Sequence, residues 1–184
     1  TIDSVVQHVV AHLQQQNATR FEPVFDSEFP IGSTRLMRTW YSTRPVLVTS
    51  KSQISHTVVD GTWEFYTAAL LEKRSDVAAY AKNDHLGFHI YYLWRGSKRK
   101  YVPDFLIRLA NGKHLVLEIK GEDSDQNRNK RMALDSWVRA VNQRGGVGAW
   151  GWELGKGHPS RGDDVIAHHA ASATNSKPIG DLSR

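Results

Sequence analysis

The chain contains no cysteine, and this absence excludes several classes of site. Without thiols there is no disulfide framework, no cysteine nucleophile and no cysteine-ligated zinc or iron–sulfur centre. No apolar run approaches the roughly 18 residues of a membrane span, and no signal peptide opens the sequence. A Gly-x-x-x-x-Gly-Lys-Ser/Thr phosphate loop is also missing, because neither Gly-Lys pair, at 112–113 and 155–156, precedes Ser or Thr. We therefore expect a cytoplasmic protein without a membrane partner that does not hydrolyse ATP through such a loop.

What the chain does contain is a mildly basic, globular composition. Its 184 residues carry 24 Lys and Arg against 19 Asp and Glu, a formal charge of +5, and 40% of them are hydrophobic. On the scale of roughly 150 residues per domain, this length corresponds to one domain with additions and suffices for a buried core. The hydrophobic share excludes global disorder, and the basic balance permits a nucleic-acid partner.

The two ends differ from the middle of the chain. Apolar residues at 2, 5, 6, 9, 10 and 13 recur at helical spacing, which predicts an N-terminal helix and connector over 1–34. Residues 155–184 hold only four large aliphatic side chains among Gly, Ser, His, Asp and Pro, which predicts a flexible C-terminal tail. The domain proper is therefore expected over 35–154.

Within that domain the hydrophobic pattern alternates between strand and helix periods. Helices are expected at about 62–74, with Asp60 or Thr62 as the N-cap, and at about 127–142. Residues 95–100 are interpreted as a basic loop. The expected strands are 35–41, 46–48, 77–81, 86–94, 101–109, 114–120 and 147–154. The order of helix, strands, helix and strand predicts an α/β sandwich around a mixed central sheet.

The most informative stretch is YVPDFLIRLANGKHLVLEIKG, residues 101–121, which contains Pro103-Asp104 and Glu118-x-Lys120. A three-residue turn over 110–112, with Gly112 in the left-handed conformation, makes the numbers of opposing residues sum to 222. A two-residue turn would instead mix polar and apolar side chains on both faces. Since a slip of one residue inverts every side chain, the pattern selects the first register. One face then consists of the apolar residues at 105, 107, 109, 115, 117 and 119.

The selected register places Asp104 directly opposite Glu118, with their Cβ atoms roughly 5 Å apart. Two ionised carboxylates at 4 Å repel by about 4 kcal/mol at an effective dielectric constant of 20, so a cation must offset them. Lys120 on the same face is one candidate, and a divalent metal is the other. Oxygen ligands suit Mg²⁺ or Mn²⁺ and not zinc. The alternative is a surface Asp–Lys–Glu cluster on a solvated sheet face.

A metal held by two acids beside a lysine is suited to phosphoryl chemistry. It polarises a phosphoryl oxygen and lowers the pKa of a bound water, while the lysine orients that water and neutralises developing charge. These residues resemble the PD-(D/E)XK nuclease superfamily. A longer collinear series, from about residue 35 to 154, resembles the C-terminal endonuclease domain of type III restriction enzyme Res-like subunits. The series is Trp63-Glu64, Tyr80–Asn83, Leu86–Phe88, Tyr91-Tyr92, Tyr101–Phe105, Leu117–Gly121, Trp137–Asn142 and Trp150.

The resemblance implies a restriction-endonuclease-like sandwich and Mg²⁺-dependent hydrolysis of DNA, with Mn²⁺ as a substitute. By it, Asp104, Glu118 and the backbone carbonyl of Ile119 hold the metal, and Lys120 is the catalytic lysine. Glu64, which follows Trp63, matches a further carboxylate that the family often has on its first helix. Charge counting supports a third acid, because three acids and one lysine leave −2, which one divalent ion balances. A helix-dipole role is the plainer interpretation of this glutamate, and Glu72 on the same helix is the second choice for the third acid.

Basic side chains near the Pro-Asp strand are candidate phosphate contacts. Four of them lie within six residues, which is typical of salt-dependent binding that does not read sequence, although a charged loop is often simply solvated. Plainer interpretations also exist for the other two lysines: Lys130 as a solvated residue on a helix, and Lys82 as the neighbour of a turn-forming Asn. The DNA-binding candidates are Arg95, Lys98, Arg99, Lys100, Lys130 and Lys82.

The resemblance also implies partners, and the residues leave other functions open. Res-like subunits carry an ATP-driven helicase or translocase domain and act with a methyltransferase subunit, so both are expected partners beside DNA. The alternatives are a repair or junction nuclease on the same scaffold, a non-catalytic DNA-binding or docking module, and a domain that couples to an ATPase motor. A zinc site at His85 and His89 is rejected, because positions four apart on a strand lie roughly 13 Å apart.

Overall fold

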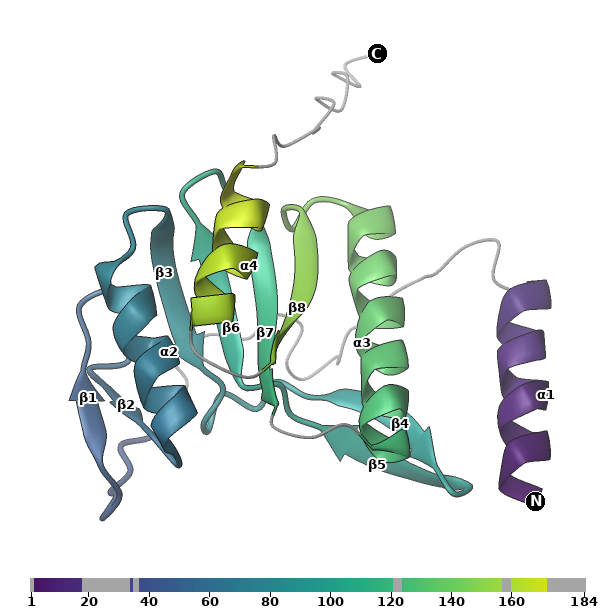
Figure 1. Cartoon of the computed structure of the whole chain (residues 1–184). Helices are drawn as coiled ribbons and strands as arrows, with labels where there is room; N and C mark the ends of the chain where they lie inside the picture. The colour runs from purple at the N-terminus through teal and green to yellow at the C-terminus, as the bar shows by residue number, and fades with distance from the viewer. Residues whose placement is uncertain (1, 18–33, 35–36, 121–123, 157–159, 172–184) are drawn as a thin grey trace.

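The computed structural model describes residues 2–17, 34, 37–120, 124–156 and 160–171, of which 11–17, 120, 156, 160–163 and 165 are described by their backbone alone (Figure 1). The helices are α1 (Ile2–Asn17), α2 (Thr62–Lys73), α3 (Asp125–Arg144) and α4 (Ser160–Ala171). The strands are β1 (Val46–Val48), β2 (His56–Val58), β3 (Val77–Lys82), β4 (Ile90–Trp94), β5 (Ser97–Tyr101), β6 (Phe105–Leu109), β7 (His114–Lys120) and β8 (Trp150–Lys156).

A mixed four-stranded sheet of order β3-β6-β7-β8 forms the centre of the molecule (Figure 1). Strand β6 is antiparallel to both of its neighbours, β3 and β7, and β8 pairs with β7 in parallel after the α3 crossover. One sheet face packs against Leu71 of α2 and Ile166 of α4, and the other against Leu134 and Val138 of α3. The predicted α/β class, with a mixed sheet and the order helix, strands, helix, strand, is confirmed.

The register predicted for the β6–β7 hairpin is confirmed. Phe105 opposes Leu117 and Ile107 opposes Leu115, as the sum of 222 requires, and Gly112 has φ +83°. The turn residue thus occupies the left-handed region, where a side chain costs energy and glycine does not. The second face of the sheet is not solvated as the alternative interpretation required, because Val116 is fully buried against α3.

Two strand predictions are wrong. Residues 37–41 are not in a strand, and the expected basic loop contains β5, which pairs with β4 through a two-residue turn. Arg95 and Gly96 both have positive φ, at 48° and 73°, as a type I′ hairpin turn requires. The expected strand 101–109 is consequently two strands, since Tyr101 ends β5 and Phe105 begins β6.

The predicted caps and tail also need correction. Gly61 is the N-cap of α2, because the Asp60 carboxylate pairs with Arg44 and Lys82. The tail expected from residue 155 onward begins as the end of β8 and continues as α4, while residues 172–184 lie outside the described part of the chain. Helix α4 is ordered because Ile166 is fully buried in the core and the Asn111 side chain donates hydrogen bonds to its last carbonyls.

Helix α1 forms as predicted, and its apolar side chains Ile2, Val5 and Val9 are exposed. It lies beside α3, apart from the two layers that cover the sheet (Figure 1). In the described part of the chain, no helix has both the length and the apolar character needed to cross a membrane.

Candidate active site at the ends of β6 and β7

Asp104 is held in place by the end of the neighbouring strand β3. The backbone N–H of Asn83 donates to the Asp104 carbonyl at 2.8 Å, and the Asn83 side-chain amide donates to the carbonyls of Pro103 and Phe88 at 3.0 and 2.9 Å. Pro103 is fully buried and has no N–H for a sheet ladder. The segment before β6 therefore leaves the sheet at a fixed point, and Asp104 stands at that point.

The Asp104 side chain closes the β6–β7 pairing. Its Oδ2 accepts a hydrogen bond from the backbone N–H of Ile119 at 2.6 Å. This oxygen replaces a backbone carbonyl acceptor, because the chain before β6 no longer pairs with β7 at this point. The N–H and C=O of one strand residue point to the same side, so the Ile119 carbonyl is directed toward Asp104 as well. The carboxylate and the carbonyl expected as metal ligands are thus neighbours.

Glu118 is a buried carboxylate with a phenol as partner. Its residue is only 4% exposed, and its Oε2 accepts a hydrogen bond from the Tyr101 hydroxyl at 2.7 Å. Burial raises the pKa of Tyr101 well above its ordinary value, and the negative charges of Glu118 and then Asp104 raise it further. The hydroxyl therefore stays protonated and donates to Glu118 at any physiological pH.

The register locates the two acids relative to each other. Asp104 precedes Phe105 and Glu118 follows Leu117, a facing pair in the core toward α2, so strand alternation directs both acids to the other side of the sheet, toward α3. Tyr101 itself packs in the core on that side. The structure thus brings Asp104, Glu118 and the backbone of Ile119 together, as the register predicted.

The cationic part of the expected site is described in part. Lys120 is the last residue of β7, opposite Lys156 in the parallel pair, and its side chain lies outside the described part of the structure. Lys130 of α3 places its Nζ 5.5 Å from the centre of the Tyr101 ring. This DNA-binding candidate is therefore brought next to the residue that holds Glu118.

Glu64 and Lys82 lie together, on the other side of the sheet from Glu118. Lys82 opposes Phe105, whose side chain packs in the core on the α2 side. Its ammonium lies 3.1 Å from the Glu64 carboxylate, 3.2 Å from Asp60 and 2.9 Å from Asp84. Glu64 also accepts a hydrogen bond from the Asp60 N–H at 2.8 Å, next to the N-terminus of α2. Both residues thus belong to a charge cluster that secures α2 against β3.

Glu72, the second choice for a third acid, also has structural partners. Its carboxylate accepts hydrogen bonds from the backbone N–H and the hydroxyl of Ser50, at 3.1 and 2.6 Å, and from the N–H of Lys51. Burial works to raise the pKa of Glu72, but the hydrogen bonds from Ser50 outweigh it and the pKa lies below its ordinary value. Glu72 fastens the segment between β1 and β2 to α2.

The remaining DNA-binding candidates are all on the β4–β5 hairpin. Lys98, Arg99 and Lys100 lie on β5, and Arg95 is in the turn, with its guanidinium 5.3 Å from the Trp94 ring. All four side chains are exposed, and within the described residues none of them forms an ion pair. The hairpin leads directly into the site, because its last residue is Tyr101.

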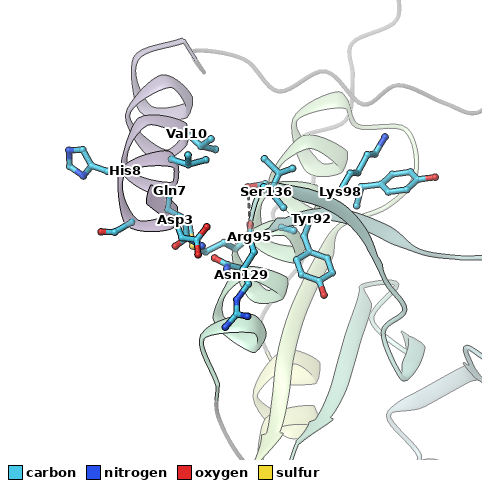
Figure 2. Close-up of a pocket in the computed structure, with 16 residues that line it drawn as sticks. Asp3, Gln7, His8, Val10, Tyr92, Arg95, Lys98, Asn129 and Ser136 are labelled. Atoms are coloured by element: carbon cyan, nitrogen blue, oxygen red, sulfur yellow. Dashed lines mark hydrogen bonds between the residues drawn. The ribbon is translucent and has the colours of Figure 1, made fainter. Parts of the chain in front are cut away.

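A pocket of about 590 Å³ lies between α1, α3 and the hairpin. Figure 2 shows Asp3 and Gln7 of α1 lying toward Arg95 and Asn129 across it. Neither Asp104 nor Glu118 lines the pocket. The acids therefore form a site at a strand end outside this cavity, whose lining on the hairpin includes Tyr91, Leu93 and Lys98.

The donor set at the strand ends fits a hard divalent cation. Two carboxylates and a main-chain carbonyl are all oxygen ligands, and Mg²⁺ in proteins is held through one or two carboxylates while it keeps several waters. Over the described ranges, no three His, Asp or Glu side chains are grouped so that they could hold a metal ion. Glu64 accordingly does not join Asp104 and Glu118 here.

Sequence reasoning missed two residues of the site, Tyr101 and Asn83, as holders of the acids. Tyr101 is the last residue of the β4–β5 hairpin, whose sequence signal is the Arg95-Gly96 pair between an apolar segment and a basic one, and Asn83 directly follows β3. Comparison of the chain with protein-family models, with curated proteins and with solved structures gives no match.

Proposed function

We propose that the protein is a divalent-metal-dependent DNA endonuclease that hydrolyses phosphodiester bonds at Asp104 and Glu118. The observation that carries this proposal is that both carboxylates are held at the ends of adjacent strands: Asp104 accepts a hydrogen bond from the N–H of Ile119, the residue after Glu118, and Glu118 is buried and accepts one from the Tyr101 hydroxyl. Two such acids held together by dedicated partners form a ligand pair for a hard cation. A solvated surface cluster would not bury Glu118.

The order of elements supports the finer fold assignment within this proposal. Helix α2, the antiparallel strands β3, β6 and β7, the crossover helix α3 and the parallel strand β8 follow the order expected for a restriction-endonuclease-like sandwich. In such a fold the acids stand where β6 and β7 part. Within a type III restriction system, an ATP-driven translocase and a methyltransferase would be the partners.

Each residue at the site would contribute a separate part of the chemistry. Asp104, Glu118 and the Ile119 carbonyl would hold Mg²⁺ or Mn²⁺, and the metal, when bound, polarises the phosphoryl oxygen and lowers the pKa of a bound water. The Tyr101 hydroxyl fixes the orientation of the Glu118 carboxylate. Lys130 and the cations of β5 attract the DNA backbone, and Lys120 on β7 is the expected partner of the developing negative charge.

The test is cleavage of supercoiled plasmid by the purified protein in Mg²⁺, Mn²⁺ or EDTA. We expect nicking with either metal and none in EDTA. Asp104→Asn and Glu118→Gln keep an acceptor for the Ile119 N–H and the Tyr101 hydroxyl but remove the charge. We expect each to slow cleavage by roughly 100-fold or more, since losing even an outer partner of a metal ligand costs 10- to 100-fold.

Asp164→Asn, which removes an exposed acid on α4, is the matched control and should cut like the unchanged protein. Nicking that survives both site substitutions at full rate would assign the activity elsewhere. Binding of DNA without cleavage in any metal would favour the non-catalytic docking module.

A further inference from the structure

We propose that the outer face of the β4–β5 hairpin is a stacking platform for unpaired bases, so that the site acts on single-stranded DNA segments. This inference rests on the proposed function for the chemistry that follows binding. The outer face comprises Tyr91 and Leu93 of β4 with Lys98 and Lys100 of β5, which oppose them across the hairpin. The endonuclease site would then receive single-stranded DNA as its substrate.

The two faces of the hairpin have opposite environments. Ile90, Tyr92 and Tyr101 on the inner face are buried against α3. On the outer face Tyr91 is 49% exposed and Leu93 is 48% exposed, which is unusual for large apolar side chains that alternate on a paired strand. Tyr91 and Leu93 thus lie on one face of the strand, half exposed and lining the pocket beside α1, while a packed core fixes the strand from behind.

Charge identifies the occupant of this face. Lys98, Lys100 and the flanking Arg95 and Arg99 are exposed and, in the described part of the chain, form no ion pairs, so their charge is available to phosphates. An exposed aromatic ring between unpaired cations is the composition of single-strand binding surfaces, where the ring stacks on a base and the cations follow the backbone. A duplex keeps its bases inside the stack and could use only the cations.

Tyr91 and Lys98 are arranged to exchange partners with a nucleotide. The Lys98 ammonium lies 3.9 Å from the centre of the Tyr91 ring, a cation–π contact that covers the ring in the free protein. A bound nucleotide supplies both groups with a stronger partner, because the phosphate takes the ammonium and the base takes the ring. A duplex phosphate would draw Lys98 away and leave the ring without a base.

The hairpin that carries the platform on its outer face ends beside the acids, which Tyr101 contacts from the inner face. Strand β5 runs from the outer-face lysines to Tyr101, whose hydroxyl contacts Glu118, and two residues separate Tyr101 from Asp104. Lys130 lies over the Tyr101 ring at the junction. A single strand lying along β4 and β5 would therefore be led to the ends of β6 and β7.

The test measures binding without cleavage. A fluorescein-labelled oligothymidine of about 20 nucleotides, longer than the 4–16 nucleotides of a typical single-strand site, is titrated with the protein in EDTA and followed by anisotropy. A duplex of the same length is titrated under the same conditions. We expect tighter binding to the single strand. Tyr91→Ala should weaken binding to the single strand roughly 5- to 150-fold, the range for loss of one base–aromatic stack, and leave duplex binding unchanged.

Two further variants separate stacking from charge. Tyr91→Phe keeps the ring and should restore single-strand affinity, whereas Lys98→Ala should reduce the slope of log K against log salt by about 0.7, the contribution of one phosphate contact on a single strand. Tyr91→Ala should leave that slope unchanged. Tyr41→Ala, which removes a tyrosine that is 96% exposed outside the hairpin, is the matched control.

Equal affinity of single strand and duplex, or unchanged single-strand affinity in Tyr91→Ala, would overturn the platform. Absence of binding to both probes would overturn it as well. None of these results depends on catalysis. The titration contains no cleavage step, so loss of cleavage in Asp104→Asn tests the endonuclease alone.

Discussion

The carboxylates of Glu118 and Asp104 are held by different kinds of hydrogen-bond donor. Glu118 has the Tyr101 hydroxyl at 2.7 Å, and Asp104 has the Ile119 peptide N–H at 2.6 Å. A buried carboxylate without a partner is costly, while hydrogen bonds to charged groups contribute roughly 1.5–3 kcal/mol each. Both donors are held by the sheet or by the hairpin, so the acids are oriented before any cation or substrate arrives.

His114 gives the first prediction at the scale of single residues. It stacks on Trp150 with ring centres 4.7 Å apart, and its Nδ1 is buried without a hydrogen-bond partner in the described part of the structure. Burial, reinforced by the positive charge of Arg108, lowers the pKa of His114. The unfolded chain therefore binds this proton more readily, and stability is full above the unfolded pKa of about 6.5.

We expect the free energy of unfolding to fall as the pH is lowered from 6.5 through the folded pKa of His114. His114→Phe keeps the stack on Trp150 and removes the titrating group, so it should flatten this part of the profile whatever its effect at pH 8. Urea unfolding between pH 8 and pH 5 measures the difference in slope. A variant whose profile parallels that of the unchanged protein would show that other groups carry the pH dependence.

Sequence reasoning reached the acids and missed their holders for a physical reason. Asp104 and Glu118 belong to one tight hairpin, whose register follows from local hydrophobic alternation and a glycine turn. Tyr101 acts through the packing of a second hairpin against α3, and Asn83 acts through hydrogen bonds from the end of β3; no local pattern specifies either contact. Glu64 was predicted from charge balance and family likeness, whereas its position is decided by Lys82, a lysine only 5% exposed among three carboxylates.

At the scale of elements, the parting of β5 from β6 creates the site. Pro103 cannot donate to a ladder, and its carbonyl is taken by the Asn83 side chain, so pairing between β6 and β7 stops at Phe105 and Leu117. The sequence predicts one strand over 101–109, because apolar residues lie on both sides of Pro103-Asp104. The break depends on the competing partner supplied by β3, which lies outside the local window.

Gly112 gives a prediction at this scale. Its φ of +83° is unfavourable for residues with a Cβ, and no atom lies within 4 Å of an added Cβ, so Gly112→Ala would introduce backbone strain without a clash. We expect it to destabilise the fold by about 1 kcal/mol. Gly61→Ala is the matched control, since that glycine has an extended backbone and open space around an added Cβ.

Chemical denaturation of the two variants measures the difference. If Gly112→Ala were as stable as Gly61→Ala, the turn would not need the left-handed conformation, and the register that opposes Asp104 to Glu118 would lose its structural basis. Gly112→Asn should lose less stability than Gly112→Ala, because asparagine tolerates the left-handed conformation better than alanine does.

At the scale of the whole molecule, the sheet separates two cores with different tasks. The core toward α3 contains Tyr101 and the inner face of the β4–β5 hairpin, so it supports the acids and the basic surface. The core toward α2 and α4 contains Phe105 and Ile166 and holds no proposed ligand. Sequence reasoning missed α4 because it counted large aliphatic residues, whereas this helix packs through Ile166, Ala170 and the His169 ring, which lies against Gly151.

This separation makes stability and binding distinguishable in one experiment. Ile166 is fully buried beneath α4, on the sheet face opposite Glu118, and Ile→Ala in a core costs about 2–5 kcal/mol. Ile166→Ala should therefore lower the free energy of unfolding by that amount while the folded fraction binds oligothymidine as before. Val5→Ala on the exposed side of α1 should change stability by less than about 0.5 kcal/mol. If Ile166→Ala left the unfolding curve in place, α4 would not be part of the folding unit. If the folded variant instead failed to bind oligothymidine, the two sheet faces would be coupled. The division into a supporting core and a substrate-side core would then be wrong.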